Sequence, residues 1–264
     1  MASPRVALSL GGPVAHVVLD RPEARNAFDG AMVRELTDAV GAASARDDVR
    51  VLVLAGRGSV FCAGADLEWM EKAGSLSREE NLEDARALFE LFHAIDRSPK
   101  AVVAAVQGAA LGGGAGLVAA ADIVVAEEGA RFGFTEVRLG LVPAVISPFV
   151  VRKIGASAAR ELFLTGERFT AARAAAIGLV QRVVPLDELD AAVDERVGEL
   201  LRAAPGAVAA AKGLVRSVSG PPVESLRELV CRLIAERRAS EEGREGLQAF
   251  LEKREPEWVT GLKD

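Results

Sequence analysis

A single glutamate stands in an apolar stretch where it could transfer protons. Residues 132–140 read Phe-Gly-Phe-Thr-Glu-Val-Arg-Leu-Gly, with Glu136 near the centre. Burial among such neighbours disfavours the charged form of a carboxyl group and raises its pKa, which fits the group for taking up and releasing a proton. A surface glutamate without a chemical role would show the same pattern. Glu136 is therefore a candidate general acid/base that needs supporting groups nearby.

A glycine-rich segment supplies candidate groups of a second kind, backbone N–H donors. Residues 108–116 read Gly-Ala-Ala-Leu-Gly-Gly-Gly-Ala-Gly. If a helix begins near Gly114, the free amides of its first turn suit a phosphate or an oxyanion. A dinucleotide-binding fold is a rival interpretation, but about six residues separate Gly116 from the next strand at Ile123, too few for the crossover helix of that fold. Glycines that serve packing alone are the other alternative.

Two further segments could complete a pocket. Residues 61–67, Phe-Cys-Ala-Gly-Ala-Asp-Leu, surround an acid with small side chains. Such a loop lets a ligand approach the backbone closely, although a loop that simply precedes a helix would look similar. Residues 140–149 form an apolar stretch punctuated by Pro143 and Pro148, and this stretch could wall a pocket.

The other reactive residue types argue against hydrolytic and metal chemistry. Cys62 and Cys231 lie far apart in the sequence, and His16 and His93 are the two histidines, so we expect neither a metal site nor a disulfide framework. The sequence has no Gly-x-Ser-x-Gly motif. We expect both histidines to be ordinary packing or surface residues and Cys62 to be a small buried hydrophobic residue rather than a nucleophile.

The elements that must position these residues alternate between strands and helices. Strand patterns cover four segments, 14–19, 51–54, 101–106 and 123–126. Between them lie an apolar helical stripe from Met32 to Ala43 and a second helix, which the capping-box pair Ser77 and Glu80 opens and which ends before Pro99. This alternation predicts an α/β fold with substantial parallel pairing.

The last third of the chain changes to successive helical patterns. Segment 224–257 is dense in Glu and Arg and carries an apolar stripe between Leu226 and Ile234. A solvated helix would have this composition too, but we expect the stripe to pack against another subunit. We therefore divide the chain into a core over 1–200 and a C-terminal helical oligomerisation or lid region over 201–264.

Composition limits the classes of function. Half of the 264 residues are hydrophobic and 27% are charged, which excludes a disordered chain. The net charge of −6 provides no general attraction to nucleic acid or to an anionic membrane, so neither is an expected partner. The charge-free stretch 101–121 is broken by glycines, and no secretory signal is visible, so we expect a soluble, cytoplasmic protein.

Together and in this order, the motifs resemble those of the crotonase (enoyl-CoA hydratase/isomerase) superfamily, over about residues 5 to 260. The matching segments are Arg21–Ala27, Ala63–Leu67, Leu111–Ala115, Phe132–Gly140, Leu164–Phe169 and Ala176–Val180. The resemblance implies a crotonase-type spiral of ββα units with a C-terminal helical region. It also implies an acyl-CoA thioester ligand and assembly into a homotrimer or a dimer of trimers.

The resemblance also implies roles for individual residues. The backbone amides of Ala65 and Gly113 match the oxyanion hole of the family, and Glu136 matches the second of the two glutamates that handle protons in well-studied hydratases. Further matches line the path of the substrate and its CoA part: Arg25 at the nucleotide end, Ala63, Asp66, Leu67, Gly112, Gly116 and Ala144. A side chain within the run from Gly112 to Gly114 would block the thioester.

The sequence departs from the family pattern at two places. Gly116 stands where the first glutamate is expected, and the apolar segment from Ala144 to Phe149 replaces glycines that often follow Pro143. These features look like a bacterial branch labelled methylglutaconyl-CoA or carboxygeranoyl-CoA hydratase. If the substrate carries a distal carboxylate, Arg131 or Arg138 could meet it.

We therefore expect an enoyl-CoA hydratase that adds water to a 2-enoyl-CoA, with a branched or carboxylated acyl group such as 3-methylglutaconyl-CoA favoured and one glutamate as acid/base. No cofactor is implied, because coenzyme A is part of the substrate. Two alternatives stay open. The first is an isomerase that moves a double bond between 3-enoyl-CoA and 2-enoyl-CoA, and the second is a non-catalytic acyl-CoA-binding subunit.

Overall fold

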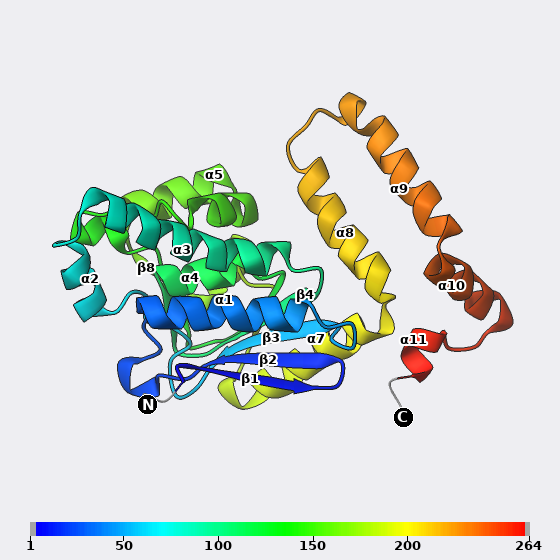
Figure 1. Cartoon of the computed structure of the whole chain (residues 1–264), viewed down its shortest axis with the longest axis horizontal. Coiled ribbons are helices and arrows are strands. Elements are labelled where there is room, and N and C mark those ends of the chain that lie inside the picture. Colours follow the sequence, from blue (N-terminus) through cyan, green and yellow to red (C-terminus); the bar gives the residue numbers. More distant parts are fainter. Residues whose placement is uncertain (1–3, 262–264) are drawn as a thin grey trace.

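A mostly parallel sheet forms the centre of the computed structural model, which describes residues 4–261 (Figure 1). In this part of the chain the sheet has six strands in the order β1-β2-β3-β4-β6-β9. β1 runs antiparallel to β2, and the other neighbouring pairs are parallel. The strands are β1 (Val6–Gly11), β2 (Val14–Leu19), β3 (Val51–Gly56), β4 (Ala101–Val106), β6 (Ile123–Glu127) and β9 (Arg182–Val184). The predicted α/β fold with parallel pairing is confirmed.

A second, smaller sheet brings two of the candidate motifs together. Its strands are β5 (Ala109–Leu111), β7 (Arg131–Gly133) and β8 (Arg168–Thr170). β5 and β7 run parallel, with Leu111 opposite Gly133. Since the carboxyl ends of parallel strands meet at one edge, the residues that follow each strand, from Gly112 and from Phe134, leave the sheet side by side.

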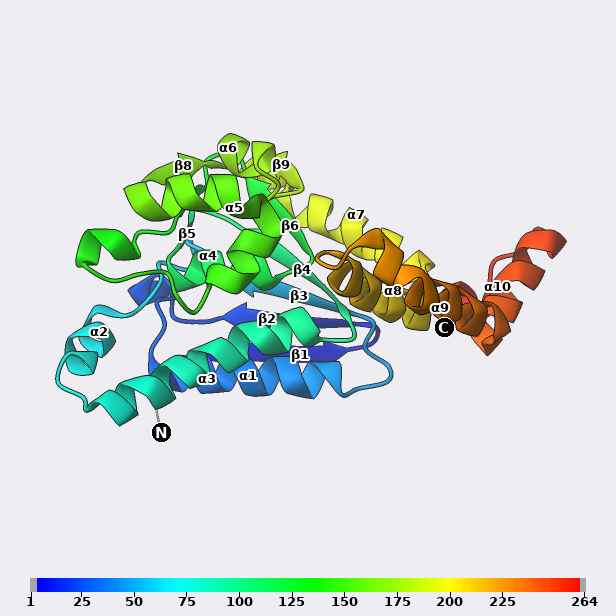
Figure 2. The ribbon, with the colours of Figure 1, turned by 90° about the horizontal axis from the view of Figure 1, so that it is seen from above.

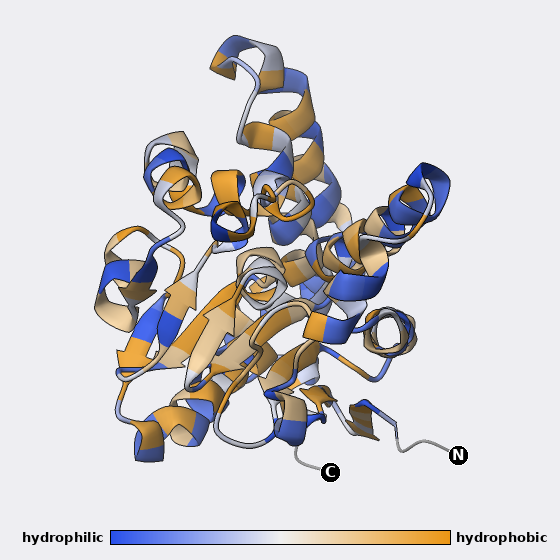
Figure 3. Cartoon of the chain, turned by 90° about the vertical axis from the view of Figure 1, so that its left-hand side faces the viewer, coloured by the Kyte–Doolittle hydropathy of each residue, from blue (hydrophilic) through white to orange (hydrophobic). Residues whose placement is uncertain are grey.

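Helices cover both faces of the main sheet because the side chains of its strands alternate. Leu52 and Leu54 belong to the larger core cluster, together with side chains of α1, α3, α4 and α5, whereas Val51 and Val53 pack with α7. Figure 3 shows the hydrophobic strands enclosed by helices with hydrophilic outer faces. The helices of this part are α1 (Gly30–Ser44), α2 (Leu67–Ala73), α3 (Arg78–Arg97), α4 (Gly113–Ala120), α5 (Ser147–Thr165), α6 (Ala171–Ala176) and α7 (Leu189–Arg202).

The glycine-rich segment becomes a helix inside the core. α4 begins at Gly113, and its residues Gly114 to Ala120 are all buried. A Cβ atom at Gly114 would lie 2.6 Å from the carbonyl oxygen of Cys62, so the helix packs directly on the neighbouring backbone. No helix in the described chain combines the length and the apolar character that a bilayer crossing requires.

The C-terminal helices extend away from this body (Figures 1 and 2). They are α8 (Pro205–Val218), α9 (Arg227–Ala239), α10 (Glu241–Glu252) and α11 (Glu257–Thr260), which confirms the predicted C-terminal helical region. Arg50 fastens the region to the sheet by donating to the carbonyl oxygens of Leu201, Ala203 and Trp258 at 2.6–2.7 Å. No residue of α8 or α9 is buried in the described chain.

Candidate active site

A cavity of about 230 Å³ lies where the candidate motifs meet. α2 and α3 form one side, the first residues of α4 another, and the segment 135–146 a third. Eighteen residues line it: Phe28, Ala63, Gly64, Ala65, Trp69, Met70, Leu88, Gly112, Gly113, Thr135, Glu136, Leu139, Leu141, Val142, Pro143, Ala144, Val145 and Ile146. The lining is apolar apart from a hydroxyl, a carboxyl group and backbone amides.

Hydrogen bonds of its neighbours fix the backbone around Ala65 and leave the Ala65 amide unpaired. Phe28 and Ala65 form an isolated parallel bridge in which the amide of Phe28 donates to Gly64 O, and the amide of Asp66 donates to Phe28 O, each at 2.7 Å. Gly64 adopts φ +98°, and a Cβ atom there would lie 2.9 Å from Leu111 O. In the described chain the amide of Ala65 donates to no protein acceptor, so it is free to bind a ligand in the cavity.

The second open amide belongs to Gly113, the first residue of α4. Gly112 precedes the helix at φ 49° and donates to Gly133 O at 2.9 Å, which ties the start of α4 to the end of β7. A Cβ atom at Gly113 would lie 2.6 Å from Cε2 of Phe28, so a larger residue does not fit. Within residues 4–261 the Gly113 amide also lacks an internal acceptor. Two unpaired donors therefore open on one cavity, and one of them stands at a helix N-terminus.

Glu136 faces this helix start from the segment that follows the neighbouring strand β7. It opens a short 3-10 helix (Glu136–Leu139) directly after β7. Its Oε1 would lie 3.4 Å from a Cβ atom at Gly112, and its Oε2 is buried without a hydrogen-bond partner in the described chain. Burial raises the pKa of Glu136 above its ordinary value of 4.5, while its own backbone amide pulls the pKa slightly the other way. Among the described residues it is the sole charged group of the lining.

Gly116 lies behind the cavity instead of lining it. A Cβ atom at this position would lie 2.4 Å from Cγ2 of Ile146 and 3.0 Å from the ring of Phe92. Ile146 and Phe92 are both buried. The space that a second acidic side chain would need is thus filled by hydrocarbon.

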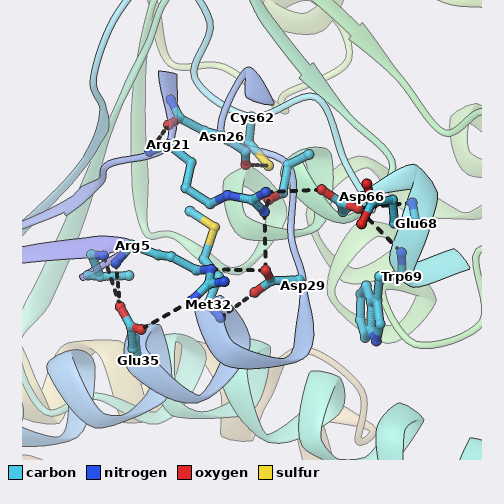
Figure 4. Close-up of polar contacts among 12 residues, drawn as sticks. Arg5, Arg21, Asn26, Asp29, Met32, Glu35, Cys62, Asp66, Glu68 and Trp69 are labelled. Carbon is cyan, nitrogen blue, oxygen red and sulfur yellow. Dashed lines mark hydrogen bonds and ion pairs between the residues drawn. The ribbon is translucent and has the colours of Figure 1, made fainter. Parts of the chain in front are cut away.

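The remaining predicted site residues lie around the rim or outside the lining. Asp66 is the N-cap of α2, where its Oδ1 accepts from the amides of Glu68 and Trp69, and its Oδ2 lies 3.2 Å from Nη2 of Arg21 (Figure 4). Leu67 is 79% exposed, and Arg25 is exposed with φ 53°. The structure thus brings six of the predicted residues together in the lining: Ala63, Ala65, Gly112, Gly113, Glu136 and Ala144.

The cysteine and histidine residues take no part in the cavity. Cys62 is buried, its Sγ donates to Asn26 O at 3.1 Å, and burial raises the pKa of its thiol to about 12 (Figure 4). A thiol with that pKa stays protonated and is a poor nucleophile at neutral pH. His16 is exposed on β2, and His93 lies on α3 beside Glu90. No group of three potential metal ligands gathers anywhere in residues 4–261.

Several lining residues were not singled out from the sequence. Trp69 and Met70 come from α2, and Leu88 comes from α3. The sequence position of Trp69 and Met70 is the available signal, because Asp66, the N-cap of α2, directly follows Ala65 and places the first turn of α2 beside the open amide. Phe28 lies one residue past the matching segment Arg21–Ala27, and its role is steric, since its ring leaves no space for a side chain at Gly113.

Comparisons with known proteins agree with this geometry. The family model described as enoyl-CoA hydratase/isomerase matches residues 10–261. A crystal structure of an enoyl-CoA hydratase from Shewanella pealeana has a TM-score of 0.93 at 41% identity and covers 96% of both chains. AtuE of Pseudomonas aeruginosa has a TM-score of 0.92 at 38% identity, over 97% of this chain and 99% of that one. The 2,3-dehydroadipyl-CoA hydratase of Escherichia coli is 34% identical over 92% of this chain and 93% of its own length.

The chain belongs to the enoyl-CoA hydratase/isomerase family, and it is an enzyme. Its fold is the crotonase fold expected from the motifs.

Proposed function

We propose that the protein is an enoyl-CoA hydratase that adds water across the C2=C3 bond of a 2-enoyl-CoA, with Glu136 as its one acid/base. The observation that carries the proposal is the place of the Glu136 carboxyl group, over the start of α4 and in one cavity with two unpaired amides. The names of the related hydratases support the same reaction.

The reaction follows from these three groups. The thioester oxygen accepts hydrogen bonds from the amides of Ala65 and Gly113, which stabilise the negative charge that develops on it as an enolate. Ionised Glu136 takes a proton from water while the water oxygen bonds to C3. The carboxyl group then returns a proton to C2, and the C=O bond of the thioester re-forms. Loss of one donor of this kind typically costs a factor of about 10²–10³ in rate.

The lining supports an uncharged acyl group. A cavity walled by Trp69, Leu141 and Ile146 favours hydrocarbon, because a carboxylate buried there would lose its hydration without gaining a partner. Arg131 donates to the carbonyl oxygens of Gly129 and Ala130, and Arg138 donates to Thr165 O. Neither arginine belongs to the lining, so the carboxylated alternative, 3-methylglutaconyl-CoA, has less support.

We propose further that the CoA part of the substrate leaves the cavity past Ala63 toward Asp66, Leu67 and Arg25. Leu67 and Arg25 are exposed, as a path for a long solvated group requires. Coenzyme A would enter as part of the substrate, without a separate cofactor. We also propose that the protein assembles as a homotrimer or a dimer of trimers through its C-terminal helices.

Mass-resolved product analysis tests the reaction. Wild type and Glu136→Gln would be incubated separately with crotonyl-CoA, a branched 2-enoyl-CoA such as tiglyl-CoA, 3-methylglutaconyl-CoA and a 3-enoyl-CoA. We expect wild type to add one water, with the branched uncharged thioester favoured, and Glu136→Gln to lose about 10²-fold or more in kcat. Unchanged turnover in Glu136→Gln would overturn the role of this carboxyl group.

A double-bond isomerase is the second candidate, and the presence of one carboxyl group in the lining favours it. One carboxylate can take a proton from C2 or C4 and return it to the other carbon. Conversion of the 3-enoyl-CoA to its 2-enoyl isomer without a mass change, together with no hydration, would establish this reaction. Thioester binding without turnover of any substrate would instead indicate a non-catalytic acyl-CoA-binding subunit.

A further inference from the structure

α4 connects the proposed oxyanion site to a charged cluster on the far side of the core. Its N-terminal amide, that of Gly113, opens on the cavity, and its C-terminal end is buried. A buried helix end leaves carbonyl oxygens that need donors, and the partial negative charge at that end favours a cation. The amide of Asp122, which would satisfy Val118 O if the helix continued, donates instead to Val102 O at 3.0 Å.

Lys153 of α5 supplies the missing donor. Its Nζ lies 2.5 Å from Ala121 O and 3.4 Å from Val118 O, so one ammonium group contacts two carbonyl oxygens at the C-terminal end of α4. The carbonyl dipoles at this helix end favour the charge of Lys153, because a cation at the C-terminal end stabilises a helix.

The other charged groups of this cluster are engaged with one another. Lys212 of α8 lies 2.7 Å from Oδ2 of Asp122, and this oxygen also accepts from the amide of Val102. On the other side, Arg152 lies 3.3 Å from Oδ1 of Asp96. The other charged residues that line the same cavity as Lys153 are Asp96 of α3, Asp122, Arg152 of α5, and Lys212 and Arg216 of α8. Burial and the nearby Lys212 lower the pKa of Lys153 to about 8, against the opposing effect of Asp122.

α5 carries the effect of Lys153 back to the substrate cavity. Gly155 interrupts the helix at φ 76° and ψ 160°, so Lys153 lies near the end of a separate first segment, 147–154. Ile146, which precedes that segment, lines the cavity and packs against Gly116 of α4. The segment is thus held along α4 at two points, by Ile146 at one end and by Lys153 at the other.

We propose that Lys153 is a positioning residue for the reaction: its ammonium group secures the C-terminal end of α4 and clamps the first segment of α5 along this helix, which keeps the Gly113 amide and the Ile146 wall in place. The role rests on the proposed function, because it acts on the amide that stabilises the enolate. We expect the loss of Lys153 to change kcat more than substrate binding, since the Gly113 amide is needed most when charge develops on the thioester oxygen.

Three variants test this role by their kinetics on crotonyl-CoA. Lys153→Met keeps the apolar stem but removes the charge and the donors, and Lys153→Arg keeps both. Lys212→Met removes a neighbouring ammonium group whose carbonyl partners, Ile95 O and Lys100 O, lie outside α4. We expect kcat to fall about tenfold in Lys153→Met with little change in KM, and to stay within about threefold of wild type in the other two variants. An equal loss of kcat in Lys153→Met and Lys212→Met, or no loss of kcat in Lys153→Met, would overturn the proposal.

The pH profile gives a readout that a merely structural role would not move. In wild type, kcat should fall as the pH rises through about 8, because Lys153 then loses the charge that secures α4. Lys153→Arg stays charged and should lack this alkaline limb. Identical alkaline limbs in the two proteins would contradict the proposal.

A measurement without turnover separates this proposal from the proposed function. Amide hydrogen exchange in the peptide covering 113–121 should be faster in Lys153→Met than in wild type and unchanged in Lys212→Met. If wild type hydrates none of the thioesters, the proposed function fails whatever the exchange data show. If wild type is active but exchange and kcat are unaffected in Lys153→Met, the role of Lys153 fails alone.

Discussion

The two oxygens of Glu136 stand in different surroundings, and this difference suits a group that must both take and give a proton. Oε1 faces Gly112 at the start of α4, and Oε2 is buried without a protein partner in residues 4–261. Because Oε2 has no protein partner there, its lone pairs are available to water and substrate. The cost is desolvation, which favours the protonated form and appears as the raised pKa.

This raised pKa predicts an early loss of activity as the pH falls. Glu136 must be ionised to take a proton from water, and between pH 4.5 and its raised pKa it is protonated where an exposed glutamate would be ionised. We expect kcat/KM for hydration to fall by about tenfold per pH unit below a midpoint that lies above 4.5. Steady-state rates between pH 4.5 and 8 measure this limb, with circular dichroism as a control for folding. A midpoint at or below 4.5 would contradict the assignment.

The packing of Ile146 on Gly116 predicts that a side chain at this position destabilises the protein. Gly116→Ala should lower the free energy of unfolding by about 1–3 kcal/mol, because its Cβ atom would overlap Cγ2 of Ile146. Gly41→Ala is the matched control: Gly41 is a helical glycine with open space around it, and the exchange should raise stability by about 0.5–1 kcal/mol. Urea unfolding measures both.

Removal of the Ile146 side chain should relieve the overlap that Gly116→Ala creates. Ile146→Ala alone leaves a cavity and should cost about 2–5 kcal/mol, but the double variant should lose less than the sum of the single losses, by about 0.5 kcal/mol or more. Additive losses would mean that Gly116 is required for another reason than contact with Ile146.

The part of the candidate site that lies within recognisable sequence motifs was predictable from the sequence. Ala65, Gly113 and Glu136 could be named because their proposed roles need an amide or a carboxyl group within a recognisable motif, and all three line one cavity. Lys153 could not be named, because its partners are carbonyl oxygens 32 and 35 residues away. Contacts of that kind leave no local pattern.

At the scale of elements, two helix starts form the site, and they are built differently. α2 begins with the side-chain cap Asp66, which also pairs with Arg21, whereas α4 begins with Gly112 in a conformation that favours glycine. The first arrangement fixes the loop that carries Ala65. The second frees the Gly113 amide for a ligand, because no capping side chain occupies it.

The cap predicts a coupled loss of stability and activity. Asp66→Ala removes acceptors for the amides of Glu68 and Trp69 and leaves Arg21 with one carboxylate fewer, so stability should fall by about 1–2 kcal/mol. Activity should also fall, since the Ala65 amide precedes the cap directly. Ser77→Ala is the control, because it removes the exposed cap of α3 and should cost about 1 kcal/mol without a change in kcat. Equal kcat values in both variants would show that the α2 cap does not position the amide.

The elements themselves were predictable where their patterns were long. The strand predicted over 101–106 has the same bounds in β4, and the capping box of Ser77 and Glu80 is formed. The short strands β5, β7 and β8 were not predicted, because three residues are too few to show a period. Yet the pairing of β5 with β7 brings Gly113 and Glu136 together. The sequence pattern therefore did not predict the contact that forms the site.

At the scale of the whole molecule, the C-terminal helices stand away from the body (Figure 2). They expose apolar side chains. Leu229, Val230 and Ile234 of α9 are 38–49% exposed, and Phe250 and Leu251 of α10 are about 80% exposed. An exposed apolar surface of this kind favours contact with another protein surface, which agrees with the proposed assembly. The helices are nevertheless held in place, because Glu242 of α10 accepts from the amides of Gly206 and Ala207 at the start of α8.

The exposed stripe predicts that assembly depends on the C-terminal helices. Light scattering after gel filtration should give three or six times the 27.6 kDa mass of the chain for wild type. Charges at Leu229 and Ile234, as in the double variant Leu229→Glu/Ile234→Glu, should shift the mass toward a single chain, because each carboxylate would have to be desolvated in the interface. Leu82→Glu, at a 49% exposed position of α3, is the control and should leave the mass unchanged. A wild-type mass of one chain would contradict the predicted assembly, and an unchanged mass in the double variant would place the interface elsewhere on the molecule.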